Sequence, residues 1–153
     1  MRKTVLYTIG YQATTVPDFL ATLTDAGVEL LVDVRRVAMS RRPGFAKSSL
    51  RANLAEAGIE YLHLRAVGTP AEGRAAAHAG HHEKMKRIFL DHLETEEAQN
   101  GLAELQQLLQ SPRPLCIMCF EHDPTHCHRT FVADALSQRM KLRVVHLMPE
   151  PAH

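Results

Sequence analysis

Several residue types are scarce in this 153-residue chain. It has no tryptophan, 5% aromatic residues and three cysteines, and 18 basic against 17 acidic residues leave a formal net charge of +1. So few aromatic side chains argue against a stacking surface for single-stranded nucleic acid, and the balanced charge gives no bulk attraction to nucleic acids or membranes. Three cysteines also cannot form a disulfide framework. A functional site must therefore arise from local clusters of residues.

Long hydrophobic runs are also absent. The longest, residues 115–120, is far shorter than the roughly 18 residues of a membrane-spanning helix. The basic start of the chain resembles a leader peptide only briefly, because Tyr7, Thr8 and Gly10 interrupt the apolar run that a leader needs. We therefore expect a cytoplasmic protein that makes no membrane contact and keeps its cysteines as thiols.

Hydrophobic residues make up 45% of the chain, enough for one core, and we expect a single domain over residues 1–153. Short apolar runs predict five strands, over residues 4–9, 29–34, 59–64, 115–119 and 142–147. Helical spacing predicts a first helix that begins near Thr14 or Thr15, and further helices over residues 48–57, 83–93, 96–109 and 127–140.

This alternation predicts an α/β fold, a three-layer Rossmann-like sandwich of about five mostly parallel strands flanked by helices. The usual strand order for such a sheet is 3-2-1-4-5. Residues 65–82 show no clear period and are expected to form a mobile loop.

Ligands bind such sheets at the carboxyl ends of the strands, and three of these ends carry unusual residues. The first strand runs into Gly10, the second ends near Asp33, and the fourth leads to Glu121. In the expected order these three residues line one crevice. A carboxylate within an apolar strand costs several kcal/mol unless it is paired, so Asp33 is either a functional group or the partner of a salt bridge to Arg35.

A basic segment follows the second strand. Between residues 35 and 51 there are six basic residues and no acidic one: Arg35, Arg36, Arg41, Arg42, Lys47 and Arg51. Guanidinium groups bind phosphate and sulfate oxygens in pairs, so we expect Arg35 and Arg41, with Ser40 and Gly10, to hold an anion. The alternative is a solvated basic loop.

The run Cys127, His128 and Arg129 opens a predicted helix. Free amide groups at a helix N-terminus favour negative charge, so an anion or a Cys127 thiolate would be stabilised there. His128 could transfer a proton near neutral pH and Arg129 could complete the anion clamp, unless both are ordinary surface residues.

Cys116 and Cys119 have the spacing of a zinc or redox pair. Residues three apart on a strand point to opposite faces, so the two cannot easily share a metal ion. We expect Cys116 to be a core residue and Cys119, at the strand end, to face the crevice.

Five short patterns taken together resemble the DUF488 family, small proteins named for their lack of an assigned function. The patterns are residues 7–10, residues 31–35, Ser40 with Arg41 and Phe45, residues 58–61, and Cys119 and Glu121 with residues 127–129. The resemblance spans most of the chain. It implies a shared site at Asp33, Arg35, Arg41, Glu121, Cys127, His128 and Arg129, without naming a substrate.

The first functional hypothesis is a phosphate-ester-binding enzyme, a metal-assisted nuclease or another hydrolase that processes nucleic acid. The arginines would hold the phosphate, Asp33 and Glu121 would bind Mg²⁺ or Mn²⁺ or act as base, and His128 would protonate the leaving oxygen. The expected partner is nucleic acid or a phosphorylated small molecule, and a homodimer is one possible oligomeric state. No nucleotide cofactor is expected.

Two alternatives stay open. Residues 31–35 also resemble the strand that carries Asp-x-Arg in rhodanese-like domains, which suggests cysteine-dependent sulfur or phosphoryl transfer with Cys119 or Cys127 as nucleophile. The six-residue loop that closes on arginine in that class is absent, since Thr125 stands six positions after Cys119. The other alternative is a non-catalytic module that binds nucleotides or nucleic acid through its arginines.

Overall fold

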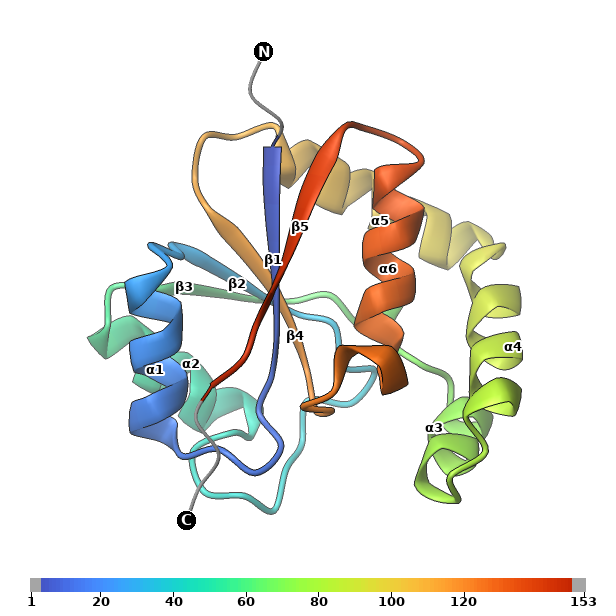
Figure 1. Cartoon of the computed structure of the whole chain (residues 1–153), viewed down its shortest axis with the longest axis horizontal. Coiled ribbons are helices and arrows are strands. Elements are labelled where there is room, and N and C mark those ends of the chain that lie inside the picture. Colours follow the sequence, from blue (N-terminus) through green and yellow to red (C-terminus); the bar gives the residue numbers. More distant parts are fainter. Residues whose placement is uncertain (1–3, 150–153) are drawn as a thin grey trace.

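A computed structural model of the chain describes residues 4–149. Five parallel strands form one sheet in the order β3-β2-β4-β1-β5 (Figure 1). The strands are β1 (Thr4–Gly10), β2 (Leu30–Asp33), β3 (Glu60–His63), β4 (Leu115–Cys119) and β5 (Leu142–Leu147). The predicted α/β class and the five parallel strands are confirmed.

Helices cover both faces of the sheet. On one face, α1 (Val16–Asp25) and α2 (Lys47–Glu56) enclose a core around Phe19, Leu31 and Leu54. On the other, α4 (His82–Leu93), α5 (Glu96–Leu109) and α6 (His128–Ser137) enclose a second core, and α3 (Ala71–His78) packs beside α4 (Figure 1). The sandwich therefore has three layers. Within residues 4–149, no helix has the length and apolar character needed to cross a bilayer.

The predicted strand order was wrong in one respect, because β4 and not β1 occupies the centre of the sheet. All five residues of β4 are buried, whereas Thr4, Val5 and Tyr7 of β1 are only partly covered. A strand that is apolar on both faces gains most from a central position, since both of its faces are then covered by helices. The exchange puts Cys119, at the end of β4, between the ends of β1 and β2.

The segment expected to be a loop, residues 65–82, contains regular structure. A 3₁₀ turn, η1 (Arg65–Val67), is followed by α3, and α4 begins at His82. The sequence of α3 shows no stripe of large apolar residues, because the helix buries only small residues, Gly73 and Ala76. Its alanine content supplies helix propensity in place of an apolar stripe.

Candidate functional site

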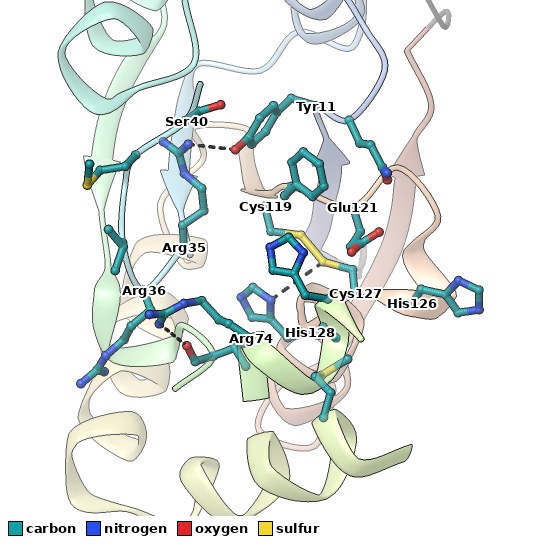
Figure 2. Close-up of a pocket in the computed structure, with 18 of the residues that line it drawn as sticks. Tyr11, Arg35, Arg36, Ser40, Arg74, Cys119, Glu121, His126, Cys127 and His128 are labelled. Atoms are coloured by element: carbon teal, nitrogen blue, oxygen red, sulfur yellow. Dashed lines mark hydrogen bonds between the residues drawn. A yellow bond between two sulfur atoms is a disulfide. The ribbon is translucent and has the colours of Figure 1, made fainter. Parts of the chain in front are cut away.

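A cavity of about 980 Å³ opens at the carboxyl ends of β1, β2 and β4 (Figure 2). Its lining comes from the turn after β1, from residues 35–42 after β2, from α3, and from residues between 119 and 128. Parallel strands bring their carboxyl ends to one edge of a sheet, so segments far apart in sequence meet there. The cavity lies where the sequence placed a ligand site.

The cavity wall is strongly basic. It includes five arginines, Arg35, Arg36, Arg41, Arg42 and Arg74, and one carboxylate, that of Glu121. Asp33 neutralises Arg35 and Glu97 neutralises Arg36, whereas the other three arginines have no ion pair within residues 4–149. Three unpaired cations against one carboxylate leave a surplus of positive charge, which favours an anionic ligand.

Three of the expected anion-binding residues meet at this wall. Arg35, Ser40 and Arg41 all line the cavity. The Ser40 hydroxyl accepts a hydrogen bond from the backbone N–H of Arg42 at 3.1 Å, which fixes the turn that carries the arginines. Arg41 is exposed at the rim. Its guanidinium is therefore free to reach a ligand.

Asp33 does not reach the cavity, contrary to our expectation for a catalytic or metal-binding group. Its side chain is 0% exposed, and Arg35 donates to both carboxylate oxygens at 2.9 and 2.7 Å. The hydroxyl of Tyr61 donates a further bond at 2.6 Å. The salt-bridge interpretation of Asp33 therefore describes the structure, and of the two carboxylates expected to bind a metal ion, only that of Glu121 lines the cavity.

This ion pair also perturbs its partners. Burial opposes the charge on Arg35, but the hydrogen bonds and negative charge of Asp33 outweigh it and raise the pKa of the guanidinium. Burial and the bond to Asp33 likewise raise the pKa of Tyr61. Arg35 donates as well to the Tyr11 hydroxyl at 3.2 Å and to the carbonyl of Phe45 at 2.8 Å. Arg35 therefore braces the wall more than it offers free donors to a ligand.

Gly10 allows a close approach of two segments by its lack of a side chain. A Cβ atom there would lie 1.7 Å from the carbonyl oxygen of Glu121 and 2.9 Å from an Arg129 nitrogen. Only glycine allows the end of β1 to approach the loop after β4 this closely. Gly10 therefore lets β1 pack against the backbone of Glu121, whose side chain lines the cavity.

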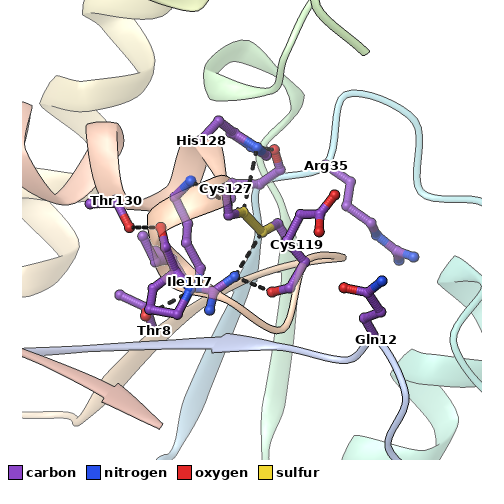
Figure 3. The surroundings of a disulfide bond; sticks show 12 residues. Thr8, Gln12, Arg35, Ile117, Cys119, Cys127, His128 and Thr130 are labelled. Carbon is purple, nitrogen blue, oxygen red and sulfur yellow. Dashed lines mark hydrogen bonds between the residues drawn. A yellow bond between two sulfur atoms is a disulfide. The ribbon is translucent and has the colours of Figure 1, made fainter. Parts of the chain in front are cut away.

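Two cysteines lie at the base of the cavity, and the expectation of free thiols holds only for the third. Cys119 at the end of β4 and Cys127 before α6 are joined by a disulfide (Figure 3). Cys116 is free and lies in the core on the opposite face of the sheet, as the strand period predicts. Cys119 and Cys127 are therefore the two cysteines that can react with a ligand in the cavity.

Arg129 lies beneath this pair and does not complete an anion clamp. Its side chain is 0% exposed, and it donates to the Cys119 sulfur at 3.3 Å, to Thr8 Oγ1 at 3.2 Å and to the carbonyls of Glu121 and His122. No carboxylate pairs with it within the described residues. Burial therefore lowers the pKa of Arg129 to about 10. The reduced thiolate of Cys119 would supply the missing counter-charge.

Cys127 is the N-cap of α6, and its sulfur accepts a hydrogen bond from the Arg129 backbone N–H at 3.5 Å. The helix N-terminus and the basic cavity both favour a thiolate at this position. His128 Nδ1 lies 3.9 Å from the same sulfur, while Nε2 contacts the Val34 carbonyl at 2.9 Å. Burial lowers the pKa of His128 to about 4, so the imidazole is neutral at pH 7 and is not a ready proton donor.

Three residues that line the cavity were not predicted as site residues from the sequence. Arg74 lies on α3, where no pattern singled it out, and its guanidinium donates to the carbonyl of Thr69. Tyr11 stacks on Phe45 with ring centroids 4.6 Å apart and presents its hydroxyl to Arg35. His126 stacks on His82 of α4 at 4.2 Å, which ties the outer helices to the loop after β4.

Comparison with known proteins gives one match. The family model described as Domain of unknown function DUF488 matches residues 15–136. No curated protein and no solved structure matches the chain. The matched span includes the basic segment, both cavity cysteines and the start of α6.

Proposed function

The chain belongs to the DUF488 family, whose name assigns no activity, and we propose that it is a cysteine-dependent sulfur-transfer enzyme for small anionic substrates. One observation carries the proposal: two cysteine sulfurs meet at the base of a cavity whose wall holds three unpaired arginines. Thiolates are the nucleophiles of sulfur transfer, and a basic cavity both attracts an anion and favours the thiolate.

The first step uses Cys127. Its thiolate attacks the outer sulfur of an anion such as thiosulfate, a new S–S bond forms at Cys127 Sγ, and the old S–S bond breaks. Sulfite leaves with the bonding electron pair, and Cys127 holds a persulfide. Arg41, Arg42 and Arg74 stabilise the charge of the substrate and of the leaving sulfite.

The second step uses Cys119. The Cys119 thiol gives its proton to the persulfide and attacks Cys127 Sγ as the thiolate, the two cysteines form a disulfide, and the carried sulfur leaves as hydrosulfide. A disulfide between Cys119 and Cys127, as found in the structure, is the product expected of this step. A dithiol reductant then restores the two thiols and is itself oxidised to a disulfide.

The neighbouring thiol is the reason to prefer sulfur transfer to the other hypotheses. A phosphocysteine is resolved by water and needs no second cysteine, whereas an adjacent thiolate can displace the outer sulfur of a persulfide by the chemistry of thiol–disulfide exchange. Metal-assisted hydrolysis of phosphodiesters drew on Asp33 and Glu121, and only Glu121 lines the cavity. A pure binding module gives no reason for a cysteine pair at the base.

The test is a single-turnover reaction of reduced, chelator-treated protein with thiosulfate. Wild type and Cys116→Ser are expected to release sulfite, because Cys116 lies on the opposite face of the sheet. Cys127→Ser releases none. Cys119→Ser releases one sulfite per chain and retains a persulfide, visible in the intact mass as one added sulfur atom.

The absence of both sulfite release and added sulfur in the reduced wild type overturns the proposal. Hydrolysis of an aryl phosphate that is lost in Cys127→Ser replaces it with phosphoryl transfer. Chelator-sensitive cleavage of plasmid DNA that survives Cys127→Ser replaces it with the nuclease.

A further inference from the structure

Three ligand atoms for a soft metal ion meet beside the cavity. The sulfurs of Cys119 and Cys127 and a ring nitrogen of His128 all lie within 4.8 Å of one another (Figure 3). Among residues 4–149 this is the one group of three or more His, Cys, Asp or Glu ligand atoms that could share an ion. We propose that the reduced protein binds Zn²⁺ through Cys119, Cys127 and His128.

His128 is oriented as a ligand by its backbone contact. Its Nε2 lies 2.9 Å from the carbonyl oxygen of Val34, and a carbonyl can only accept, so Nε2 carries the ring proton. The lone pair of Nδ1 is then left on the side of Cys127 Sγ, at 3.9 Å. Metal-binding histidines usually donate their second nitrogen in this way, which fixes both tautomer and ring orientation.

The spacing of the site suits an ion between the sulfurs. Tetrahedral zinc with Zn–S near 2.3 Å and Zn–N near 2.0 Å separates its sulfur and nitrogen ligand atoms by about 3.5 to 3.8 Å, close to the Cys127–His128 contact. The Cα atoms of Cys119 and Cys127 are 7.5 Å apart, which is wide for a disulfide and leaves room for the sulfurs to separate on reduction.

The charge of the two thiolates and the number of protein ligands also fit a bound Zn²⁺. Two thiolates balance the charge of Zn²⁺, and Arg129 donates to Cys119 Sγ from behind, as groups around metal-bound sulfur often do. Three protein ligands leave a fourth position, and both cysteines line the basic cavity. Sites with three protein ligands and an open position are typical of reactive zinc, whereas structural sites are closed by four.

Zinc and the disulfide exclude each other. A peroxide oxidises the two bound thiolates by two electrons, which forms the S–S bond and releases Zn²⁺. The peroxide takes up the two electrons and two protons, so hydrogen peroxide becomes two molecules of water and an alkyl peroxide becomes an alcohol and water. Zinc binding itself does not depend on the proposed sulfur transfer. The consequence that zinc blocks that reaction does rest on it, because both use the same thiolates.

The test is titration of the reduced protein with Co²⁺, followed by displacement with Zn²⁺. One Co²⁺ per chain is expected, with a thiolate-to-cobalt charge-transfer band and the strong visible bands of tetrahedral cobalt. Cys119→Ser, Cys127→Ser and His128→Asn should each weaken binding by about a hundredfold or more, since second-shell changes alone cost 10 to 100-fold.

Matched controls separate ligands from neighbours. Cys116→Ser, on the other face of the sheet, and His126→Ala, at the exposed cavity edge, should bind Co²⁺ as the wild type does. Hydrogen peroxide should release the ion, and the released zinc is measured with a chromogenic chelator. An absent charge-transfer band, or one that is unchanged in Cys127→Ser, overturns the zinc site. The thiosulfate reaction is run with chelator and therefore without zinc. A failure of that reaction would count against the proposed sulfur transfer and not against the zinc site.

Discussion

Arg35 and Asp33 form a bidentate ion pair inside the protein, with Nε 2.9 Å from Oδ1 and Nη2 2.7 Å from Oδ2. The backbone N–H of Arg35 also donates to Oδ1, at 3.0 Å. The pair therefore ties the end of β2 to the start of the basic segment. The pair holds the cavity wall in place, and each of its two buried charges is stabilised only while the other is present.

Asp33→Asn is expected to destabilise the protein by about 3 to 5 kcal/mol, because it leaves the Arg35 guanidinium buried without a counter-charge. Glu60→Gln is the matched control, since it removes an exposed ion pair with Arg113 and should cost less than about 1 kcal/mol. Urea unfolding measures both. A small loss in Asp33→Asn accompanied by the loss of a magnesium-dependent activity would return Asp33 to a catalytic role.

Two substitutions in the turn after β1 should act in opposite directions. Gly10→Ala puts a methyl group 1.7 Å from the Glu121 carbonyl and should cost about 3 kcal/mol or more, beyond ordinary overpacking. Ala13 has a φ of 61°, so Ala13→Gly should stabilise the protein by up to about 1 kcal/mol. Thermal unfolding of the two variants tests the pair, and a tolerated Gly10→Ala contradicts the close approach.

Much of the fold was readable from local patterns. The bounds of α5, β4 and β5 match their predictions, because strong apolar periodicity and flanking breakers delimit these elements. Thr15, one of the two threonines expected near the start of the first helix, is the N-cap of α1. The strand order was less accessible, since it depends on which strand is covered on both faces, and the complete burial of β4 decides it.

The site was predicted in outline but not in the roles of its residues. The basic segment and the start of α6 do meet at one cavity, as parallel strand ends require. Sequence could not show whether an arginine faces solvent or the interior, and Arg129, expected at the surface of the site, is fully buried. Nor could it show that Cys119 and Cys127 meet, because they are joined through the path of the loop between β4 and α6.

Arg74→Gln is expected to weaken binding of an anionic substrate, because it removes one of three unpaired cations from the cavity wall. For thiosulfate, KM should rise by about three- to tenfold with little change in kcat, and the effect should shrink at high salt. Arg139→Gln is the control, since Arg139 lies outside the cavity and contacts Gln99 and Gln106. Equal kinetics of Arg74→Gln and Arg139→Gln would remove α3 from the site.

His146 should make stability depend on pH in one direction. The Thr8 hydroxyl accepts a hydrogen bond from Arg129 Nε and lies 2.6 Å from His146 Nδ1, where a neutral imidazole can accept the hydroxyl proton. Burial and the charge of Arg129 lower the pKa of His146. The neutral ring therefore stabilises the fold above the ordinary pKa of about 6.5, and this contribution is lost as the pH falls below it.

The measurement for His146 is the free energy of unfolding from pH 8 to pH 5, in wild type and in His146→Gln. The wild type should lose more stability than the variant on acidification, by less than about 1 kcal/mol because the ring is partly exposed. Parallel curves for the two proteins would show that the protonation of His146 is not coupled to folding.

Arg129→Lys separates the charge of Arg129 from its shape. An ammonium group keeps a cation near Cys119 but cannot reach Thr8 Oγ1, the Cys119 sulfur and the carbonyls of residues 121 and 122 at once. Charged hydrogen bonds contribute about 1.5 to 3 kcal/mol each, so the loss of two or more should destabilise the reduced protein by about 3 kcal/mol or more. A nearby positive charge favours the thiolate, so we expect iodoacetamide to alkylate the cavity thiols of the reduced wild type at neutral pH, and the same alkylation should persist in Arg129→Lys because the charge remains. A variant as stable as wild type but with slow alkylation at neutral pH would mean that Arg129 acts on the thiols through its hydrogen bond to sulfur and not through its charge.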